Sequence, residues 1–462
     1  MVVKPTLESV GTIPAAGGGP DHAVLPKARR DPARRTVIGA ALGATLVGSA
    51  GAGGALWRNS KRVRVPLLSE TVALSGFSRP TLVPPGRGED VIPSTRILHN
   101  AEDLTRLFAA ERSWFRSGAE WTQAADRWSE LTRSSLADIR ALMLPSGAVV
   151  AGWSPAWRYI WPRDSAHVAV ALAKSGLASS GIGVLQFLSR VQSPSGWFEA
   201  RYRPDGSGPP DARGRQLDGT GWVLWAARHV IEALSADSRA RLDGGIISMV
   251  DRSVSLILST MQTPSGLPSP SPDYWEVQED VLTLGTVAPL AAGLSNAAAL
   301  YTLLGNREAS KRASEASLQL RATVDETFGQ DGYPRHLHGD DYDAAPAFLL
   351  PPYTETSSLR VLAAVSHSQG AMHRPAGGLA PGTGWKDDGI SWTPETAQFA
   401  LAHAANGNHT EAVRHLEWLE AHRTMVGSFP EKVLYDGSPA GVAPLAWTAA
   451  LVLLAIRELS LK

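Results

Sequence analysis

The chain has 462 residues, of which 44% are hydrophobic and 19% are charged, and its mean hydropathy is −0.09. This composition predicts a globular protein with a large core, and it excludes a disordered chain or a polytopic membrane protein. The 44 Lys and Arg residues equal the 44 Asp and Glu residues, so the charge balance argues against a nucleic acid partner. Because the sequence has no cysteine, disulfide bonds, thiolate nucleophiles and Cys-ligated metal centres are excluded.

The N-terminal part of the chain is typical of an export signal or a membrane anchor. Residues 1–35 are rich in Pro, Gly and Arg without hydrophobic periodicity, which predicts a disordered basic N-terminus. Residues 36–57 contain no charged residue and are long enough to cross a bilayer as a helix. The pair Arg34-Arg35 directly before this segment resembles a twin-arginine export signal. We therefore expect an exported or cell-envelope protein with a possible N-terminal membrane contact, and the sequence leaves open whether the segment is cleaved.

A proline-rich stretch connects this signal to the main body. Residues 58–97 include Pro66, Pro80, Pro84 and Pro85, which predicts an extended linker that crosses the surface of the body. We expect the catalytic domain to cover residues 98–462.

The rest of the chain is predicted to be helical almost throughout. Apolar residues recur at helical spacing over 103–114, 121–142, 164–174, 181–191, 219–234, 242–261, 278–304, 308–327, 354–365, 394–406, 410–423 and 443–459. No second break in composition appears, so we expect one all-α domain. Twelve helices that follow one another in pairs favour a closed double ring of helices. A helical solenoid is the alternative, although no repeat of fixed period is present.

The candidate chemistry lies in the loops between these helices. The sequence has no Gly-rich phosphate loop, no His-Glu-x-x-His and no Gly-x-Ser-x-Gly motif, which removes the usual signatures of nucleotide, zinc-hydrolase and serine-hydrolase sites. Carboxylates in tryptophan-rich loops remain. The 15 Trp outnumber the 8 Tyr and the 9 Phe, and a flat indole is suited to stacking on a sugar, although a large core explains the same count.

The first such loop runs from residue 157 to residue 164. Adjacent Arg163 and Asp164 offer hydrogen-bond donors and acceptors for vicinal hydroxyl groups, beside the flat faces of Tyr159 and Trp161. The alternative is that Asp164 only caps the helix that begins there.

Two further loops carry one glutamate each. Glu276 follows Trp275 at a predicted helix start, and a carboxyl beside an indole can be kept protonated by desolvation, as a catalytic acid requires. Glu431 follows Pro430 in a short loop, from which it could act as a base. Each glutamate alone is equally explained by an ordinary first-turn or solvated acid.

In this order, these motifs resemble the glucoamylase-like glycoside hydrolases of family 15. The resemblance rests on Trp161-Pro162-Arg163-Asp164, Gln216 to Gly221, Tyr274-Trp275-Glu276, Asp343 to Pro351, Pro430-Glu431-Lys432 and Pro444 to Trp447, and it spans roughly residues 145–455. It implies an (α/α)6 barrel, the six-hairpin toroid of this family, and an inverting O-glycosyl hydrolase that needs no cofactor.

The resemblance also implies roles for individual residues. Glu276 corresponds to the general acid and Glu431 to the general base, while Arg163 and Asp164 hold the terminal glucosyl unit. Such enzymes release β-D-glucose from the non-reducing end of α-glucosides, and the short single-domain bacterial branch acts on isomaltose and other small α-glucosides.

The sequence departs from the family pattern at two places. Val277 stands where many relatives have a second acid, and the Trp385-Lys386 pair stands where relatives often have an arginine, whose fork lysine cannot reproduce. We keep Trp275, Trp385 and Lys386 as candidate substrate-binding residues and expect weak binding beyond the cleaved bond.

Other acidic residues are assigned structural roles. Glu199, Glu279 and Glu395 lie at or beside helix boundaries, where capping or a salt bridge explains them. Asp340, Asp341 and Asp343 lack the spacing of a calcium loop, so we predict no metal. A glycan-binding toroid without turnover and a trehalase of the same fold remain as alternatives.

Overall fold

The computed structural model describes residues 63–117 and 126–461 of the chain. The predicted disordered segment 1–35 and the predicted signal or anchor 36–57 lie outside these residues, so both stay predictions. Among the helices within the described ranges, none has both the length and the apolar character that a bilayer crossing requires.

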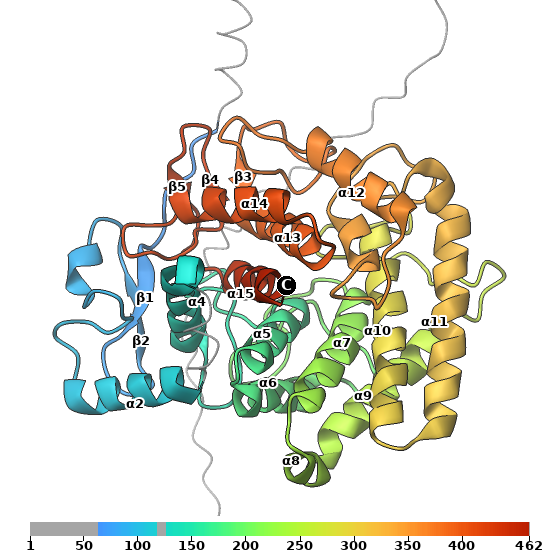
Figure 1. Cartoon of the computed structure of the whole chain (residues 1–462), viewed down its shortest axis with the longest axis horizontal. Coiled ribbons are helices and arrows are strands. Elements are labelled where there is room, and N and C mark those ends of the chain that lie inside the picture. The colour runs from blue at the N-terminus through green and yellow to red at the C-terminus, as the bar shows by residue number, and fades with distance from the viewer. Residues whose placement is uncertain (1–62, 118–125, 462) are drawn as a thin grey trace, which may run out of the picture. The chain divides into compact units, whose positions relative to one another are not determined.

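Six inner elements form a closed ring. They are α5 (Pro162–Lys174), α7 (Asp218–Glu232), α10 (Leu284–Leu303), the short 3-10 helix η4 (Ala345–Leu349), α13 (Thr393–Ala405) and α15 (Ala446–Ser460). Each packs against the next in this order, and α15 returns to α5 (Figure 1). These helices are buried on nearly all sides, which explains why their sequences are apolar around the whole circumference.

Six outer helices surround this ring. They are α4 (Ser129–Leu142), α6 (Ala178–Val191), α9 (Gly244–Thr260), α11 (Arg307–Thr327), α12 (Leu359–Ala371) and α14 (His409–Ala421). They pack respectively on α15, α5, α7, α10, η4 and α13, so every inner element has an outer partner. Each outer helix buries only one face, as its amphipathic sequence predicts. The predicted double ring is therefore present.

All twelve predicted helices are found, but one of them is not part of the ring. Helix α2 (Leu104–Ser117) packs its Leu107 in a separate small cluster, and η4 occupies the remaining inner position. Pro346, Pro351 and Pro352 prevent a long helix at η4. The prediction that twelve long helices make the ring was thus wrong in one member. Shorter helices complete the list: α8 (Ala236–Ala240), η1 (Gly88–Asp90), η2 (Asp126–Trp128) and η3 (Gly329–Asp331).

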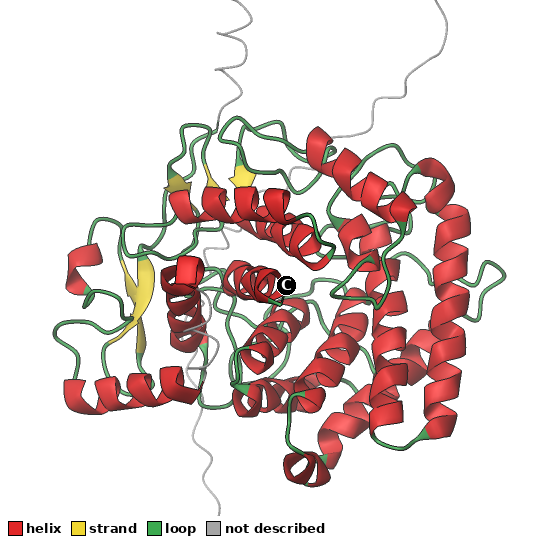
Figure 2. Cartoon of the chain, in the orientation of Figure 1, coloured by secondary structure: helices red, strands yellow, loops and turns green. Residues whose placement is uncertain are grey.

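Strands are few and short (Figure 2). Strand β1 (Thr71–Leu74) pairs antiparallel with β2 (Pro80–Val83), with Thr71 opposite Val83. Val72 is fully buried in the main core, so this hairpin is built into the body and does not merely cross its surface as the proline content predicted. A proline at the end of a strand does not prevent the neighbouring apolar residues from forming an antiparallel strand pair.

A second sheet positions the functional loops. Its strands β3 (Ser391–Trp392), β4 (Lys432–Val433) and β5 (Pro439–Ala440) are antiparallel in this order, and Trp392 stands opposite Lys432. The sheet joins the start of α13 to the loop that carries Glu431.

Candidate active site

The inner helices bring polar side chains to one end of the ring. Arg163 and Asp164 lie in the first turn of α5, Asp218 opens α7, and Trp447 lies in the first turn of α15. All four are buried, and the Arg163 guanidinium lies over the Trp447 ring at 4.5 Å from its centroid. The amino-terminal ends of inner helices therefore share one pocket, as their common direction requires.

Glu276 is held by a tight turn in front of α10. Its backbone N–H donates to the carbonyl of Asp273 at 2.8 Å, and its φ of 57° lies in the left-handed region. The Asp273 carboxylate accepts from the N–H of Trp275 at 2.9 Å and from both terminal nitrogens of Arg335. An unfavourable backbone angle persists only where neighbours fix it, so this turn gives Glu276 a defined direction.

Two arginines face the Glu276 carboxylate. Arg163 Nη2 lies 3.9 Å from Oε1, and Arg213 Nη1 contacts Oε2. Arg213 also lies 3.4 Å from Asp211, which in turn pairs with Arg201. Sequence reasoning missed Arg213, because the loop around residues 203–215 is rich in Pro and Gly and shows only a high density of arginine.

Glu431 comes from a loop that is distant in sequence from Glu276. Its backbone N–H donates to Val442 at 2.8 Å, its carbonyl accepts from Thr393, and its side chain is 7% exposed. Burial raises the pKa of the Glu431 carboxyl, the nearby ammonium of Lys432 at 3.2 Å opposes this, and the Glu276 charge raises it further. The Glu276 carboxyl therefore acts on the Glu431 carboxyl although the two come from distant loops.

The Arg163-Asp164 pair keeps hydrogen-bonding capacity for a ligand. Arg163 donates from Nε to Asp164 Oδ1 at 3.1 Å, and its Nη2 lies 3.0 Å from the same oxygen. Arg163 Nη1 is buried without a hydrogen-bond partner among the described residues. Burial raises the pKa of Asp164 to about 6, with Arg163 opposing the shift and Glu276 adding to it.

Aromatic side chains make the walls. Trp161 is buried with Tyr159 edge-on at 6.4 Å, and the Arg201 guanidinium lies over both rings. On the other side Trp275 meets Trp385 perpendicularly at 5.1 Å. These four predicted aromatic residues thus lie beside the candidate carboxyls.

Lys386 is placed apart from these residues. Its side chain is exposed, and within residues 63–117 and 126–461 it forms no ion pair. Only its backbone carbonyl is engaged, by Arg374 at 2.8 Å. The structure therefore does not bring Lys386 into the pocket with Trp385.

Several buried polar atoms around the pocket lack a protein partner among the described residues. They are Trp161 Nε1, Arg163 Nη1, Asp218 Oδ1, Trp275 Nε1, Trp385 Nε1, Glu395 Oε2 and Trp447 Nε1. Buried polar groups are nearly always hydrogen-bonded, so this concentration indicates a binding site for a molecule with many hydroxyl groups.

Comparisons with known proteins agree with this chemistry. No family model matches the chain. The isomaltose glucohydrolase of Kribbella flavida is 27% identical over 387 residues, which cover 72% of this chain and 94% of that protein. An uncharacterized glycosyl hydrolase of Methanocaldococcus jannaschii is 29% identical over 99 residues, and the chain spans only 16% of its length.

Solved structures show the same fold. A glycosidase aligns with a TM-score of 0.62 and 22% identity, covering 73% of this chain and 98% of that one. A bacterial glucoamylase complexed with acarbose aligns with a TM-score of 0.61 and 17% identity, covering 73% of this chain and 56% of that one. In sequence and in fold, the chain is similar to glucoamylase-like glycoside hydrolases. The resemblance predicted from the order of the motifs is confirmed.

Two of the three glutamates assigned to structural roles have those roles in the hydrolase. Glu199 pairs with Arg215 at 3.0 Å, and Glu279 pairs with Arg335 at 2.6 Å. Glu395 differs. It is 6% exposed in the first turn of α13, where its carboxyl interacts with its own backbone N–H. Its Oε2 has no partner and it forms no ion pair among the described residues, so a capping or salt-bridge role accounts for only part of this carboxyl.

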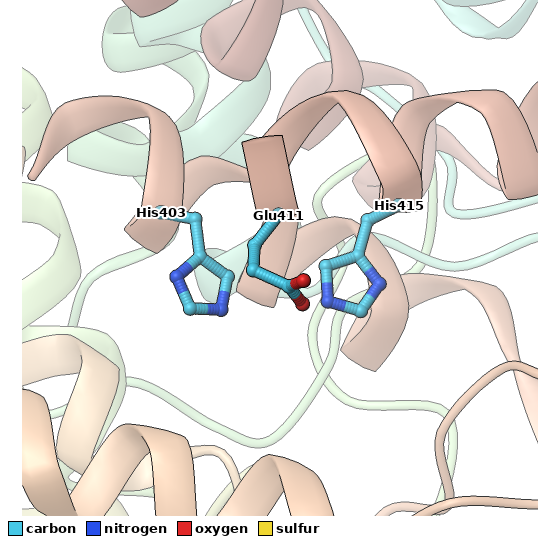
Figure 3. A group of neighbouring side chains, drawn as sticks. All are labelled: His403, Glu411 and His415. Atoms are coloured by element: carbon cyan, nitrogen blue, oxygen red, sulfur yellow. The ribbon is translucent and has the colours of Figure 1, made fainter. Parts of the chain in front are cut away.

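Three side chains that could hold a metal lie where α13 meets α14 (Figure 3). The ligand atoms of His403, Glu411 and His415 lie within 4.8 Å of one another, whereas zinc bonds of about 2.0–2.1 Å would bring them to roughly 3.4 Å. Gln369 already bridges His403 and Glu411 at 2.5 and 2.9 Å, and Arg414 pairs with Glu411 at 2.6 Å. The group is explained as a hydrogen-bonded contact between two helices.

A separate cavity of about 690 Å³ lies between residues 88–99 and 420–427. Its buried Arg96 is already bound to Asp138 and Ser134, and its Arg423 is bound to Glu130. Two of the three arginines that line this cavity are thus paired within the protein, the third, Arg133, contacts the Ser94 carbonyl, and the cavity does not include the candidate catalytic residues.

Proposed function

We propose that this hydrolase is an inverting, exo-acting α-glucosidase that releases β-D-glucose from the non-reducing end of short α-1,6-linked glucosides such as isomaltose. The observation that carries the proposal is the pair of carboxyls, Glu276 and Glu431, which come from separate loops and lie close enough for the Glu276 charge to raise the pKa of Glu431. The similarity to isomaltose glucohydrolase over most of both chains supports the choice of linkage.

In the proposed reaction Glu276 donates a proton to the glycosidic oxygen while Glu431 accepts a proton from the attacking water. Inverting enzymes keep the two carboxyls about 6.5–9.5 Å apart so that the water fits between the base and the sugar. A base must take up a proton during the step, and burial, which raises the pKa of Glu431, favours this.

Substrate orientation is assigned to the residues around Arg163. The free Nη1 of Arg163 donates to a sugar hydroxyl and Asp164 accepts from a neighbouring one, while Trp161 and Trp447 face the apolar side of the ring. These contacts hold the terminal glucosyl unit and leave its anomeric carbon between the two carboxyls.

The Arg213 contact must change when substrate binds. The Arg213 guanidinium contacts the Glu276 carboxyl, whereas the proposed general acid must face the glycosidic oxygen of the substrate. The Arg213 side chain is 40% exposed and is therefore free to be displaced by the leaving-group sugar. We propose that entry of this sugar separates Arg213 from Glu276.

Short substrates are proposed because few groups remain to bind longer ones. The Val277 side chain cannot accept a hydrogen bond, and the Lys386 side chain is exposed outside the pocket. Remote binding energy is what raises turnover on longer chains, so we expect kcat/KM on a disaccharide to equal or exceed that on a tetrasaccharide.

Export to the cell envelope is proposed from residues outside the described structure. Arg34-Arg35 before the uncharged segment 36–57 supports a twin-arginine signal. Replacement of both arginines with lysine should leave the protein in the cytoplasm. Unchanged export would indicate an ordinary signal or anchor.

A panel of glucose disaccharides tests the proposed function. We expect glucose release to be fastest from isomaltose and slower from maltose, with the Glu431→Gln variant as the inactive control. Faster hydrolysis of trehalose would assign a trehalase instead, and no release from any α-glucoside would overturn the proposal.

A further inference from the structure

The Glu395 carboxyl is a third acid of the pocket. It projects from the first turn of α13, whose start is fixed to the Glu431 loop by two hydrogen bonds: Thr393 N–H to the Glu431 carbonyl at 3.1 Å and Thr393 Oγ1 to the Pro430 carbonyl at 2.6 Å. Thr448 of α15 braces the same turn at 2.9 Å from Thr393 Oγ1. Glu395 and the candidate base are thus held by one rigid unit.

The charged groups that act on Glu395 come from three other elements. They are Arg163 of α5, Asp343 in front of η4 and Glu431 in front of β4. Two of the three are carboxylates, and Arg163 is already engaged by Asp164. No cation pairs with Glu395 among the described residues, and its Oε2 is buried without a donor. The Glu395 carboxyl interacts with its own backbone N–H, but a negative charge on it would be buried beside two other carboxyls, so the acid form is favoured.

Gln398, the polar neighbour on the same helix face, uses only its side-chain oxygen elsewhere, and its Nε2 is buried without a partner among the described residues. One turn along α13, the Gln398 side-chain oxygen accepts from Tyr353 at 2.8 Å, and Tyr353 contacts His167 at 3.0 Å. His167 completes this chain by a 2.8 Å contact with the Arg163 carbonyl. Burial lowers the pKa of His167 to about 3, so the chain stays uncharged and supports the pocket floor.

We propose that Glu395 is a positioning residue that stays protonated in the working enzyme and uses its O–H to hold the Glu431 carboxylate or the water that Glu431 activates. This inference rests on the proposed role of Glu431. A neutral carboxylic acid suits the place because it donates a hydrogen bond without adding a negative charge beside the base. Burial, with Glu431 adding to it, raises the pKa of Glu395 to about 8, so the donor is present below that pH and is lost above it.

Two substitutions separate this role from simple packing. Glu395→Gln keeps a neutral donor, and at pH 6 we expect its kcat/KM to stay within about fivefold of the wild type. Glu395→Leu keeps the volume without the donor and should lose about 10²-fold, mainly in kcat, as the loss of a positioned proton-transfer group does. Its melting temperature should be unchanged or higher, because a buried polar atom without a partner is removed.

The pH dependence of kcat/KM would not change on substitution of Glu395 if this residue served only in packing. Above about pH 8 the wild type loses the Glu395 proton, so log kcat/KM should fall there with a slope that is steeper by about one unit than in Glu395→Gln, which has no proton to lose at this position. Glu199→Gln, outside the pocket, is the matched control and should keep the wild-type slope. An unchanged slope in Glu395→Gln, or a Glu395→Leu variant within about threefold of the wild type, would overturn the proposal.

Infrared difference spectroscopy tests the protonation state without any substrate. At pH 7 the wild type should show a carboxylic-acid carbonyl band that is absent from Glu395→Gln and present in Glu199→Gln. Identical spectra for the wild type and Glu395→Gln would overturn the proposal even if the substrate of the enzyme differs from the one proposed.

Discussion

Two buried charged clusters lie at the same end of the ring, and they differ in how their oxygens are used. In the anchor cluster, defined as Arg335 with Asp273, Glu279 and Asp343, every carboxylate oxygen has a partner: Arg335, His336 or a backbone N–H. In the sugar pocket, defined as Arg163, Asp164, Asp218, Glu276, Glu395 and Glu431, atoms such as Asp218 Oδ1 and Glu395 Oε2 have none among the described residues.

The difference teaches that burial and charge alone do not mark a site. Arg335 is 1% exposed and Arg163 is 5% exposed, so both side chains are buried from solvent. The anchor cluster uses its hydrogen-bonding capacity to fix the turn in front of Glu276. The sugar pocket keeps part of its capacity for a ligand.

The largest expected effect comes from Glu276 and Glu431, the proposed acid and base. Glu276→Gln and Glu431→Gln should each lower kcat by about 10²–10⁴-fold, because general acid and base groups contribute that much. Neither should lower the melting temperature, since Glu431 is buried at an energetic cost and Glu276 is half-buried in an ion pair with the 40% exposed Arg213. Steady-state kinetics and a thermal melt check this, and more than about a tenth of the wild-type activity would contradict the assigned roles.

Removing the arginine of the anchor cluster should act on stability. Arg335→Met leaves three buried carboxylates without their cation, and we expect the free energy of unfolding to fall by about 3–5 kcal/mol. Arg163→Met is the matched control and should lose less, because it contacts one carboxylate closely where Arg335 contacts three. Denaturant titration measures both, and equal losses would break the comparison.

A conservative substitution in the sugar pocket should lower kcat/KM. Arg163→Lys keeps the charge but loses the planar fork, and we expect kcat/KM to fall about 10- to 100-fold, as the loss of a charged hydrogen bond predicts. The melting temperature should change little. Michaelis–Menten kinetics on isomaltose would contradict the sugar-binding role if kcat/KM were unchanged.

The smallest effect concerns pH. The pKa of Asp164 is raised to about 6, so its carboxylate is present above that pH and is protonated below it. Glucose binding to Glu431→Gln, measured by calorimetry, should weaken as the pH falls through about 6, by about tenfold if one charged hydrogen bond is lost. Asp164→Asn should bind weakly at all these pH values, and an equally pH-dependent Asp164→Asn would assign the transition to another group.

Much of this arrangement could be predicted from the sequence. The apolar periodicity located the helices, and the motif order identified Glu276, Glu431 and the Arg163-Asp164 pair. The inner-ring position of η4 could not be predicted from the sequence. Three prolines interrupt this segment, and only its burial in the structure shows that it belongs to the inner ring. Arg213 was not singled out, and Glu395 was assigned only a structural role, for another reason. Their surroundings are created by chain segments distant in sequence, and neither residue stands in a pattern that marks it.

The anomeric form of the first glucose released tests the central claim most directly. If Glu431 activates water opposite the bond that Glu276 protonates, proton NMR during the first minutes of isomaltose hydrolysis should show β-D-glucose before mutarotation. Initial release of α-D-glucose would contradict the account, because it would require a retaining mechanism with a different use of the carboxyls.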